Sequence, residues 1–242
     1  MMERLDKILS NARIGSRKEV TALIKAGRIM VNDAVVKQPA AKFDPDKDKF
    51  YLDELPVDTR KFIYLILNKP AGYLSATEDN FDPVVTDLLA LQHGVFAPFP
   101  VGRLDKDTTG LLLMTNDGEL NHKLISPRWQ VDKVYVARLQ EPAEEKYQDK
   151  FQKGIVLDDG YRTLPGHVRI LSEDQRTVEV TIQEGKFHQV KRMFEALGNK
   201  VIDLERIRFG PISLPEDLAL GEYRELDEDE RNALFQEVAK KP

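Results

Sequence analysis

Gly102-Arg-Leu-Asp-Lys-Asp-Thr-Thr-Gly-Leu-Leu-Leu-Met-Thr-Asn-Asp-Gly118 is the segment of this 242-residue chain that is densest in chemically able side chains. Its apolar run Leu111–Thr115 predicts a buried strand. The polar loop before it can aim one carboxylate into a cleft from that rigid support. In extended chain Arg103 and Asp105 lie on one face, where the cation keeps the carboxylate ionised. Asp105 is therefore the candidate catalytic residue; the alternative is a turn in which Asp and Thr side chains cap backbone groups.

Apolar runs on both sides of this segment predict an α+β body. The continuous run 62–67 predicts a buried strand that ends in Asn68-Lys-Pro-Ala-Gly72. Further strands are expected at 111–115, 133–139, 167–171 and 177–182. Helices are expected at 83–91, 118–124, 142–153, 187–198 and 227–239. Because the five strands outnumber the four helices that precede the C-terminal one, at irregular spacing, the fold class is α+β with a mixed or antiparallel sheet and flanking helices.

The first part of the chain predicts a separate small α+β domain of two helices and a hairpin. Apolar spacing in Glu3–Ile14 favours one helix, and Ser16 with Glu19 is a capping-box pattern that starts another. A strand, the Asn32-Asp33 turn and a second strand follow. Residues 39–61 are rich in Pro, Asp and Lys, and we place a linker at 55–61. The expected domains are 1–58 and 59–242.

Charge is unevenly distributed along the chain. The net charge of −5 combines a net +4 over residues 1–28 with a net −5 over residues 213–242. Cations of the first part avoid its apolar positions, so they can share a surface suited to phosphates; the alternative is a solvated face. The candidate RNA-binding residues there are Arg4, Lys7, Arg13, Arg17, Lys18 and Arg28.

Composition excludes several classes of site. The chain has no cysteine, which removes disulfides and thiol nucleophiles and fits a reducing, cytoplasmic compartment. Its four histidines have no paired spacing, so no metal site is expected. We expect no signal peptide and no membrane span, since the N-terminus turns charged at once and no apolar run is long enough. Dinucleotide and phosphate-loop glycine patterns are missing, so no cofactor is expected.

Two families compete for the central segment. Asp105-Lys-Asp107-Thr-Thr109 resembles the Asp-x-Asp-x-Thr loop of the magnesium-dependent haloacid-dehalogenase-like phosphatases, and Asp158-Asp159 could supply their downstream acidic pair. In that family the nucleophile directly follows an apolar strand, whereas Pro98, Pro100 and Gly102 precede it here. The alternating strand–helix pattern of that fold is also missing.

The second resemblance covers residues 3–225. The whole 102–118 segment resembles the catalytic motif of pseudouridine synthases of the small-subunit rRNA type. Asn68–Gly72 resembles the early strand and turn of this family, and Lys133-Val-Tyr-Val136 its Lys-x-Tyr motif, with Val134 where Thr is commoner. Glu184–Phe194, continuing to Leu204-Glu-Arg-Ile207, resembles its C-terminal motif. The first domain resembles the αL-type RNA-binding domain that often precedes this catalytic body.

This resemblance implies isomerisation of a uridine in folded rRNA to pseudouridine. The uracil is cut from its ribose, turned and rejoined through carbon 5. Asp105 matches the catalytic aspartate and can act covalently on a sugar or base carbon, or as a base; both routes stay open. The target base must leave its stack, and Tyr135 matches the residue that packs on its face. Arg103 matches a residue that prises out the base or holds the backbone.

The C-terminal motif supplies further candidates. The resemblance implies a basic partner for Asp105, and we favour Arg192 because a guanidinium can grip a carboxylate through two bonds. Lys191 then serves as a phosphate contact or for solubility, and His188 faces RNA, with a structural histidine as the alternative. Phe187, Val190, Phe194 and Leu197 repeat at helical spacing and are expected in the core. Leu204 is a candidate for the apolar wall behind the base.

The expected partner is rRNA or a ribosomal-subunit assembly intermediate, bound by a monomer. Length, the first domain and Gly221-Glu-Tyr-Arg224 favour a uridine of small-subunit rRNA. The alternatives are the same reaction on large-subunit rRNA, or a non-catalytic rRNA-binding or ribosome-assembly factor.

Overall fold

The computed structural model describes residues 2–45 and 47–239. The chain divides into two compact units, Met1–Phe62 and Ile63–Pro242. The predicted boundary, which follows residue 58, precedes this division by residues 59–62. Each unit has its own apolar core, and each is described by itself below.

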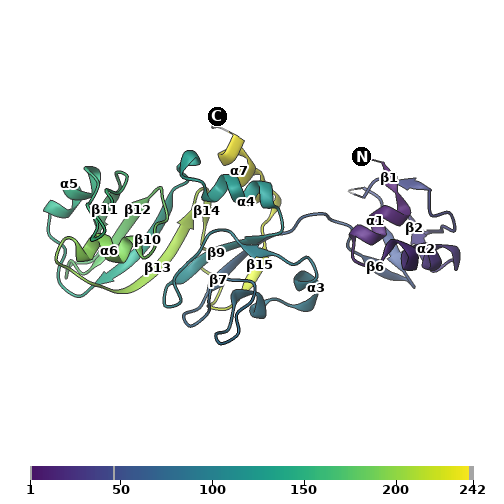
Figure 1. Ribbon diagram of the computed structural model, residues 1–242, viewed down its shortest axis with the longest axis horizontal. Coiled ribbons are helices and arrows are strands. Elements are labelled where there is room, and N and C mark those ends of the chain that lie inside the picture. The colour runs from purple at the N-terminus through teal and green to yellow at the C-terminus, as the bar shows by residue number, and fades with distance from the viewer. Residues whose placement is uncertain (1, 46, 240–242) are drawn as a thin grey trace. The chain divides into compact units, whose positions relative to one another are not determined.

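The first unit is the small α+β domain, built on two helices and short strands (Figure 1). Its elements are β1 (Glu3–Arg4), α1 (Leu5–Asn11), α2 (Arg17–Lys25), β2 (Ile29–Val31), β3 (Ala34–Val35), β4 (Lys42–Phe43), β5 (Phe50–Leu52) and β6 (Leu55–Val57). The capping box forms as predicted: the Ser16 side chain accepts from the Glu19 amide, and the Glu19 carboxylate accepts from the Ser16 amide. The first helix begins at Leu5 rather than Glu3, because Glu3 and Arg4 pair with β4.

The second unit is a nine-stranded mixed sheet with helices on both faces. Its strands are β7 (Tyr64–Lys69), β8 (Phe99–Pro100), β9 (Thr109–Thr115), β10 (Lys133–Leu139), β11 (His167–Ile170), β12 (Thr177–Ile182), β13 (Val201–Phe209), β14 (Ile212–Ser213) and β15 (Tyr223–Glu225). Its helices are η1 (Val85–Leu88), α3 (Leu91–Gly94), α4 (Gly118–Ile125), η2 (Pro127–Trp129), α5 (Lys146–Gln152), α6 (Gln189–Glu195) and α7 (Glu228–Ala239).

One parallel pairing joins the two antiparallel halves of this sheet. The strand order is β11-β12-β10-β13-β9-β7-β15, with β14 on β13 and β8 on β9. β13 runs parallel to β9, with Glu205 opposite Thr109 and Arg206 opposite Gly110. The other pairings in this sheet are antiparallel. The central segment therefore lies at the junction of the two halves.

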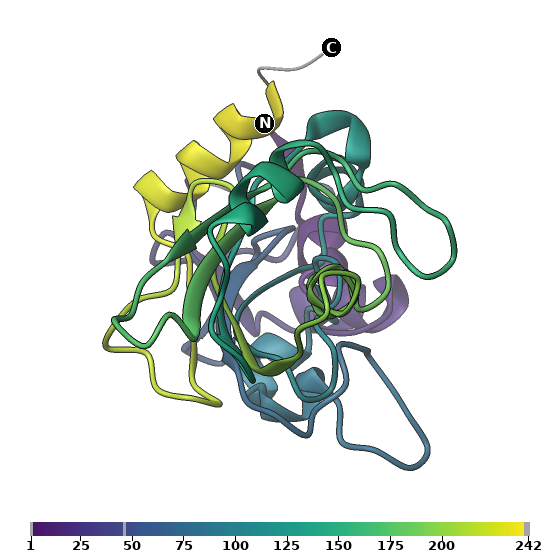
Figure 2. The same cartoon turned by 90° about the vertical axis from the view of Figure 1, so that its left-hand side faces the viewer.

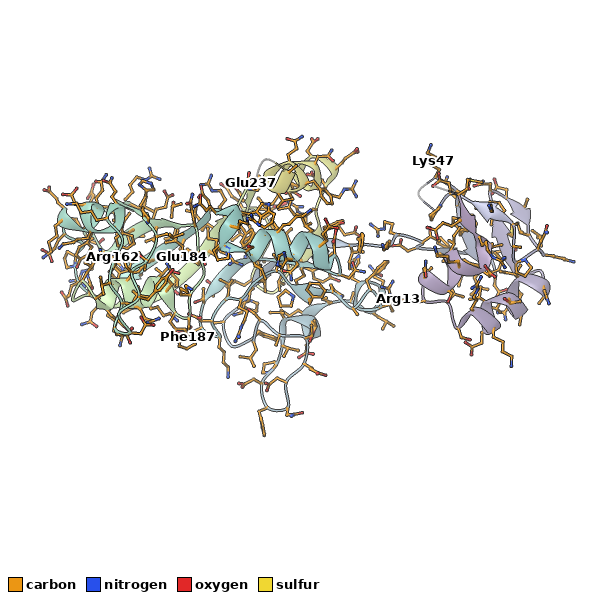
Figure 3. All side chains as sticks on the ribbon, turned by 45° about the horizontal axis from the view of Figure 1, so that its top comes forward. Arg13, Lys47, Arg162, Glu184, Phe187 and Glu237 are labelled. Atoms are coloured by element: carbon orange, nitrogen blue, oxygen red, sulfur yellow. The ribbon has the colours of Figure 1, made fainter. Side chains whose placement is uncertain are left out.

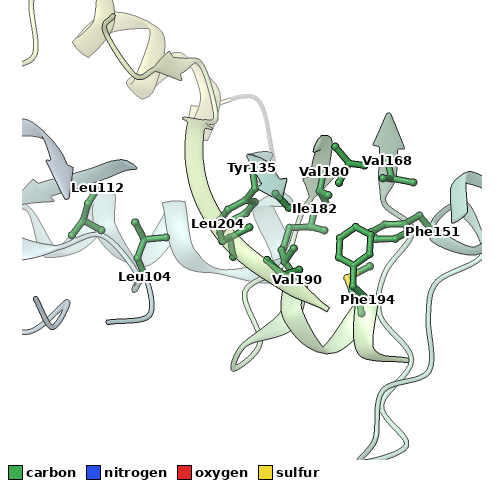
Figure 4. Close-up of a cluster of buried hydrophobic side chains, with 14 of the residues drawn as sticks. Leu104, Leu112, Tyr135, Phe151, Val168, Val180, Ile182, Val190, Phe194 and Leu204 are labelled. Carbon is green, nitrogen blue, oxygen red and sulfur yellow. The ribbon is translucent and has the colours of Figure 1, made fainter. Parts of the chain in front are cut away.

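Alternation along the strands divides the core into two layers. On β9, Leu112 and Met114 face the layer covered by α5 and α6, while Leu111 and Leu113 face the layer covered by α4 and α7. Residues 111–114 are all apolar because both faces of β9 are buried. In Figure 4 the rings of Phe151 and Phe194 meet beneath the strands, and their centroids are 5.4 Å apart. Figure 2 looks onto the β11 end of the sheet, where α5 and α6 lie.

The fold class and most elements match the expectations, and the differences have local causes. The helix expected at 83–91 is instead η1 and the short α3, separated by the extended residues Leu89 and Ala90. β13, the longest strand, was not predicted, because its inward residues Val201, Leu204, Arg206 and Phe209 do not alternate regularly. A register shift against β10 accompanies that irregularity. In the described part of the chain, no helix is long and apolar enough to cross a membrane.

The junction predicts a strict requirement for glycine at position 110. Gly110 has a φ of +94°, and a Cβ there would lie 2.4 Å from the Arg206 carbonyl oxygen. We expect Gly110→Ala to lower the free energy of unfolding by about 3 kcal/mol or more, through positive φ and backbone overlap together. Gly118→Ala is the control: it begins α4 in open space and should leave stability unchanged or slightly raised. Equal stability of the two variants in chemical denaturation contradicts the requirement.

Candidate active site

The loop that carries Asp105 is held in place from two directions. The buried ammonium of Lys69, at the end of β7, donates to the carbonyl oxygens of Lys106 at 3.2 Å and Thr108 at 2.8 Å. On the other side of Asp105, the Ser75 hydroxyl donates to the Leu104 carbonyl and accepts from the Leu104 amide. The backbone on both sides of the carboxylate is therefore fixed by neighbouring segments before any substrate arrives.

The Asp105 carboxylate faces the start of α6. Lys191 Nζ lies 3.1 Å from Asp105 Oδ2 and 2.6 Å from Asp107 Oδ1. His188 Nε2 lies 3.6 Å from Asp105 Oδ1. Burial disfavours the Lys191 ammonium, but its hydrogen bonds to Asp107 and Asp105 outweigh burial and raise its pKa. The hydrogen bond from Lys191 also lowers the pKa of Asp107. Lys191 is thus a cation fixed against the candidate catalytic group.

The expected pairing of Arg192 with Asp105 is wrong. Arg192 binds Asp158 and Asp159 instead, with Nη2 2.7 Å from Asp159 Oδ2. Adjacent residues on a helix point about 100° apart, so Lys191 and Arg192 cannot both face the carboxylate. Lys191 takes the role assigned to Arg192, and Arg192 ties α6 to the loop before Tyr161.

Asp105 lies at the polar edge of a cavity of about 560 Å³, beside a smaller cavity of about 60 Å³. Tyr135 on β10 lines both, and Leu204 on β13 lines the smaller one. Both side chains are buried in the core layer drawn in Figure 4, so they form a rigid apolar wall. The structure therefore brings together Asp105, Tyr135 and Leu204, as the sequence predicted. Arg103 lines both cavities, and its side chain is exposed.

The larger cavity is strongly cationic. Its lining includes one acidic residue, Asp105, and five basic ones: Arg103, Lys106, Lys133, Lys186 and Arg206. Such a lining raises the local concentration of a polyanion, whatever the net charge of the whole chain. The net −5 of the sequence therefore says little about the ligand of this site.

Two of these cations are buried, and sequence reasoning gave them no role. Lys133 donates to the Val131 carbonyl, and burial, reinforced by Arg206, lowers its pKa to about 8. Arg206 Nε donates to the Leu111 carbonyl at 2.8 Å, while its Nη2 is buried without a partner in the described residues. Both cations lie about 5 Å from the centre of the Phe209 ring. The sequence pattern that could have indicated them is a basic residue at an inward-facing position of an otherwise apolar strand.

Lys69 is a third buried cation that sequence reasoning passed over. Burial lowers its pKa to about 8, although Asp107 and Asp105 act in the opposite direction. Its three hydrogen-bond partners are carbonyl oxygens, including that of Pro70 at 3.0 Å. A lysine just after the apolar run 62–67 could have indicated such a buried hydrogen-bonding residue.

The candidate RNA-binding cations of the first unit are exposed, and several form surface ion pairs. Arg4 and Arg17 both bind Asp6. The pKa of Asp6 is lowered to about 2, and the hydrogen bond from Arg4 is the largest cause. Lys7 binds Glu3 at 2.8 Å, and Arg28 binds Asp53. The paired cations remain about half exposed, so their outer faces are open to solvent. Lys18 and Arg13 are also exposed.

Within residues 2–45 and 47–239, no group of three or more His, Cys, Asp or Glu side chains is arranged to hold a metal ion. The acidic pair that suggested a phosphatase, Asp158 and Asp159, is taken up by Arg192. It lies on a different loop from Asp105 and lines neither cavity at that carboxylate. The phosphatase interpretation is therefore not supported by the geometry.

A fixed carboxylate against an aromatic wall, inside a cationic cavity, suits chemistry on a base carried by a phosphodiester chain. Together with a basic α+β domain, it defines an enzyme that acts on RNA. Family models agree for both units: RNA pseudouridylate synthase matches residues 63–196, and the S4 domain matches residues 3–48. The chain belongs to the RNA pseudouridine synthase family, and it is an isomerase of RNA uridine.

Relatives match over nearly the whole chain. An uncharacterised RNA pseudouridine synthase of Bacillus subtilis is 46% identical, over 96% of this chain and 98% of its own. Ribosomal small subunit pseudouridine synthase A of Vibrio vulnificus is 40% identical, over 96% and 99%. Ribosomal large subunit pseudouridine synthase B of Bacillus subtilis is 38% identical, over 93% and 92%. A solved pseudouridylate synthase structure, 35% identical, covers 96% of this chain and 99% of its own with a TM-score of 0.68.

Substitutions of the two basic residues of α6 should affect kcat to different extents. Lys191→Gln removes the charged hydrogen bond to Asp105, and we expect kcat to fall about 10- to 100-fold. Arg192→Gln removes exposed ion pairs, and kcat should change less than about threefold. Rejoining the uracil through carbon 5 expels the hydrogen there, so tritium release from [5-³H]uridine RNA measures turnover. An equal loss of kcat in the two variants contradicts the assignment of Lys191.

Proposed function

We propose that this enzyme converts one uridine of small-subunit rRNA to pseudouridine, with Asp105 as the catalytic group. The observation that carries the proposal is the position of Asp105, fixed between Lys191 and the wall of Tyr135 and Leu204. The small subunit is favoured by the full-length match to an enzyme named for it. The segment Gly221–Arg224 adds to this. The match to an enzyme named for the large subunit makes that rRNA the comparison to test.

Asp105 would act as a carboxylate, with the opposite charge of Lys191 3.1 Å away. In the reaction the bond from ribose C1′ to uracil N1 breaks, a bond from C1′ to C5 forms, the C5 hydrogen leaves and N1 gains a proton. A carboxylate can assist by bonding covalently to the sugar or the base, or by accepting the C5 proton. The cavity is open to either route. In both, the negative charge of Asp105 must lie next to the reacting carbon. The loop anchors at Leu104 and Thr108 would hold it there.

The remaining cavity residues would bind the flipped nucleotide. Tyr135 offers its ring to the base, and base–aromatic stacking contributes about 1–3 kcal/mol. Arg103 is exposed at the edge of the cavity, where a guanidinium can contact a phosphate or fill the place of the extruded base. His188, beside Asp105, is positioned to contact the same nucleotide. Leu204 closes the wall behind it.

The first unit would capture rRNA through its phosphates. Its six candidate cations are exposed, and exposed cations suit a sequence-independent electrostatic contact. We further propose that the enzyme works as a monomer in the cytoplasm. The lack of cysteine suits a reducing compartment.

The two acidic partners of Lys191 provide a matched test of catalysis. We expect Asp105→Asn to abolish tritium release while RNA affinity stays within about threefold, because the amide keeps the shape and loses the charge and basicity. Asp107→Asn also removes a carboxylate from Lys191, but that group lines neither cavity, so activity should persist. Full activity of Asp105→Asn rules out the mechanism. The same assay on small- and large-subunit rRNA, each free and partly assembled, identifies the substrate.

The role of the first unit can be tested by salt dependence. Without residues 1–58, RNA affinity should weaken, and the slope of log affinity against log salt should flatten by about 0.7–0.9 for each phosphate that the enzyme no longer neutralises. Lys18→Gln should flatten the slope by no more than the amount expected for a single phosphate. Lys150→Gln, an exposed cation on α5, is the control and should change nothing. An unchanged slope in the truncated enzyme shows that the first unit does not anchor RNA.

A further inference from the structure

Phe187 is not a core residue, contrary to its helical spacing with Val190 and Phe194. It is 74% exposed, while Val190 and Phe194 are buried. Helix α6 begins at Gln189, after His188, so Phe187 lies outside the helix whose periodicity it extends. Figure 3 shows Phe187 at the margin of the second unit. It lines the larger cavity together with Asp105 and Tyr135. Its exposure within the lining of this cavity leaves the ring open to a ligand there.

The ring is held by a turn with defined geometry. Phe187 stacks on His188, with centroids 3.8 Å apart and planes at 18°. His188 has a φ of 49°, which is a strained conformation for a residue with a side chain. The turn is braced because the Gln189 side chain accepts from the Lys186 amide and donates to buried Glu184. His188 in turn lies 3.6 Å from Asp105. The stacked pair thus extends from the active carboxylate to the surface.

The surroundings of the pair favour nucleic acid over protein. Exposed Arg103, Lys106 and Lys186 line the same cavity as Phe187. Aromatic rings between cations are the combination that binds single-stranded nucleic acid, because bases stack on the rings while phosphates contact the cations. Base extrusion leaves a neighbouring base without its stacking partner, and a flat ring at the mouth of the site can replace it.

We propose that Phe187, backed by His188, is a stacking platform for the nucleobase next to the flipped uridine. The proposal rests on the proposed function and deepens it: Tyr135 contacts the target base, and Phe187 contacts its neighbour. Phe187 is therefore a positioning residue that stabilises the opened RNA, not a catalytic one. Loss of its ring should weaken productive binding and leave the chemical step of the bound uridine nearly intact.

Kinetics on tritiated rRNA tests the platform. Phe187→Ala should lower kcat/KM by about tenfold or more, mostly through KM, with single-turnover kcat within about threefold of wild type. Phe187→Tyr keeps a ring and should stay within about twofold of wild type. Leu91→Ala removes an equally exposed apolar side chain from α3 and is the control. Thermal unfolding checks that all variants fold. A kcat/KM of Phe187→Ala within twofold of wild type overturns the proposal.

A binding measurement separates this proposal from the proposed function. The probe is a single-stranded RNA with 2-aminopurine beside a central uridine, titrated into the Asp105→Asn enzyme with and without Phe187→Ala. Stacking on Phe187 should quench the 2-aminopurine signal, and Phe187→Ala should abolish that quenching. If wild type releases no tritium from any rRNA but quenching still depends on Phe187, the proposed function fails and the platform stands. If quenching is the same in both proteins, the platform is excluded.

Discussion

The parallel pairing of β13 with β9 is the constraint on which the site depends. It joins two antiparallel half-sheets, and it is possible because Gly110 has no side chain where the Arg206 backbone passes. Arg206 reinforces the junction with its hydrogen bond to the Leu111 carbonyl. The β9 half supplies the Asp105 loop, and the β13 half supplies Tyr135 through β10 and Lys191 through α6. The proposed catalytic group, the aromatic wall and the cationic partner therefore meet because two half-sheets meet.

Buried cations around this junction contribute positive charge near the site. Lys69, Lys133 and Arg206 are each nine-tenths buried or more, and backbone carbonyls supply their hydrogen bonds. Burial is unfavourable for a cation, and the depressed pKa values of both lysines reflect it. Of these three cations, Lys133 and Arg206 line the larger cavity, and their charge there attracts a polyanion. Groups with perturbed pKa values cluster at functional sites.

Features that depend on residues close together in the sequence could be predicted from it, whereas features that depend on tertiary packing could not. The Asp105 loop, the Tyr135 strand and the Ser16 capping box follow from short-range patterns, and the structure contains them. Which residue of α6 pairs with Asp105 depends on how the helix is rotated about its axis. Lys191 and Arg192 are adjacent and point in different directions, so a pattern that locates the helix does not tell which of them faces Asp105. Phe187 was misjudged because periodicity does not reveal where a helix begins. β13 was missed because its register shift breaks the alternation that identifies a strand.

Sequence charge and site charge also differ for a physical reason. The acidic excess lies at residues 213–242, whereas the cavity is lined by cations from strands and loops far apart in the chain. An average over the sequence cannot detect charges that the fold brings together. The single acidic residue in that lining is Asp105, the proposed catalytic group.

The most direct test is to map pseudouridine in rRNA from cells that lack the gene, complemented with either the wild-type enzyme or Asp105→Asn. The account predicts that one pseudouridine of small-subunit rRNA disappears on deletion, returns with the wild-type enzyme and stays absent with Asp105→Asn. An rRNA pseudouridine profile that is unchanged by deletion, or that Asp105→Asn restores, contradicts it.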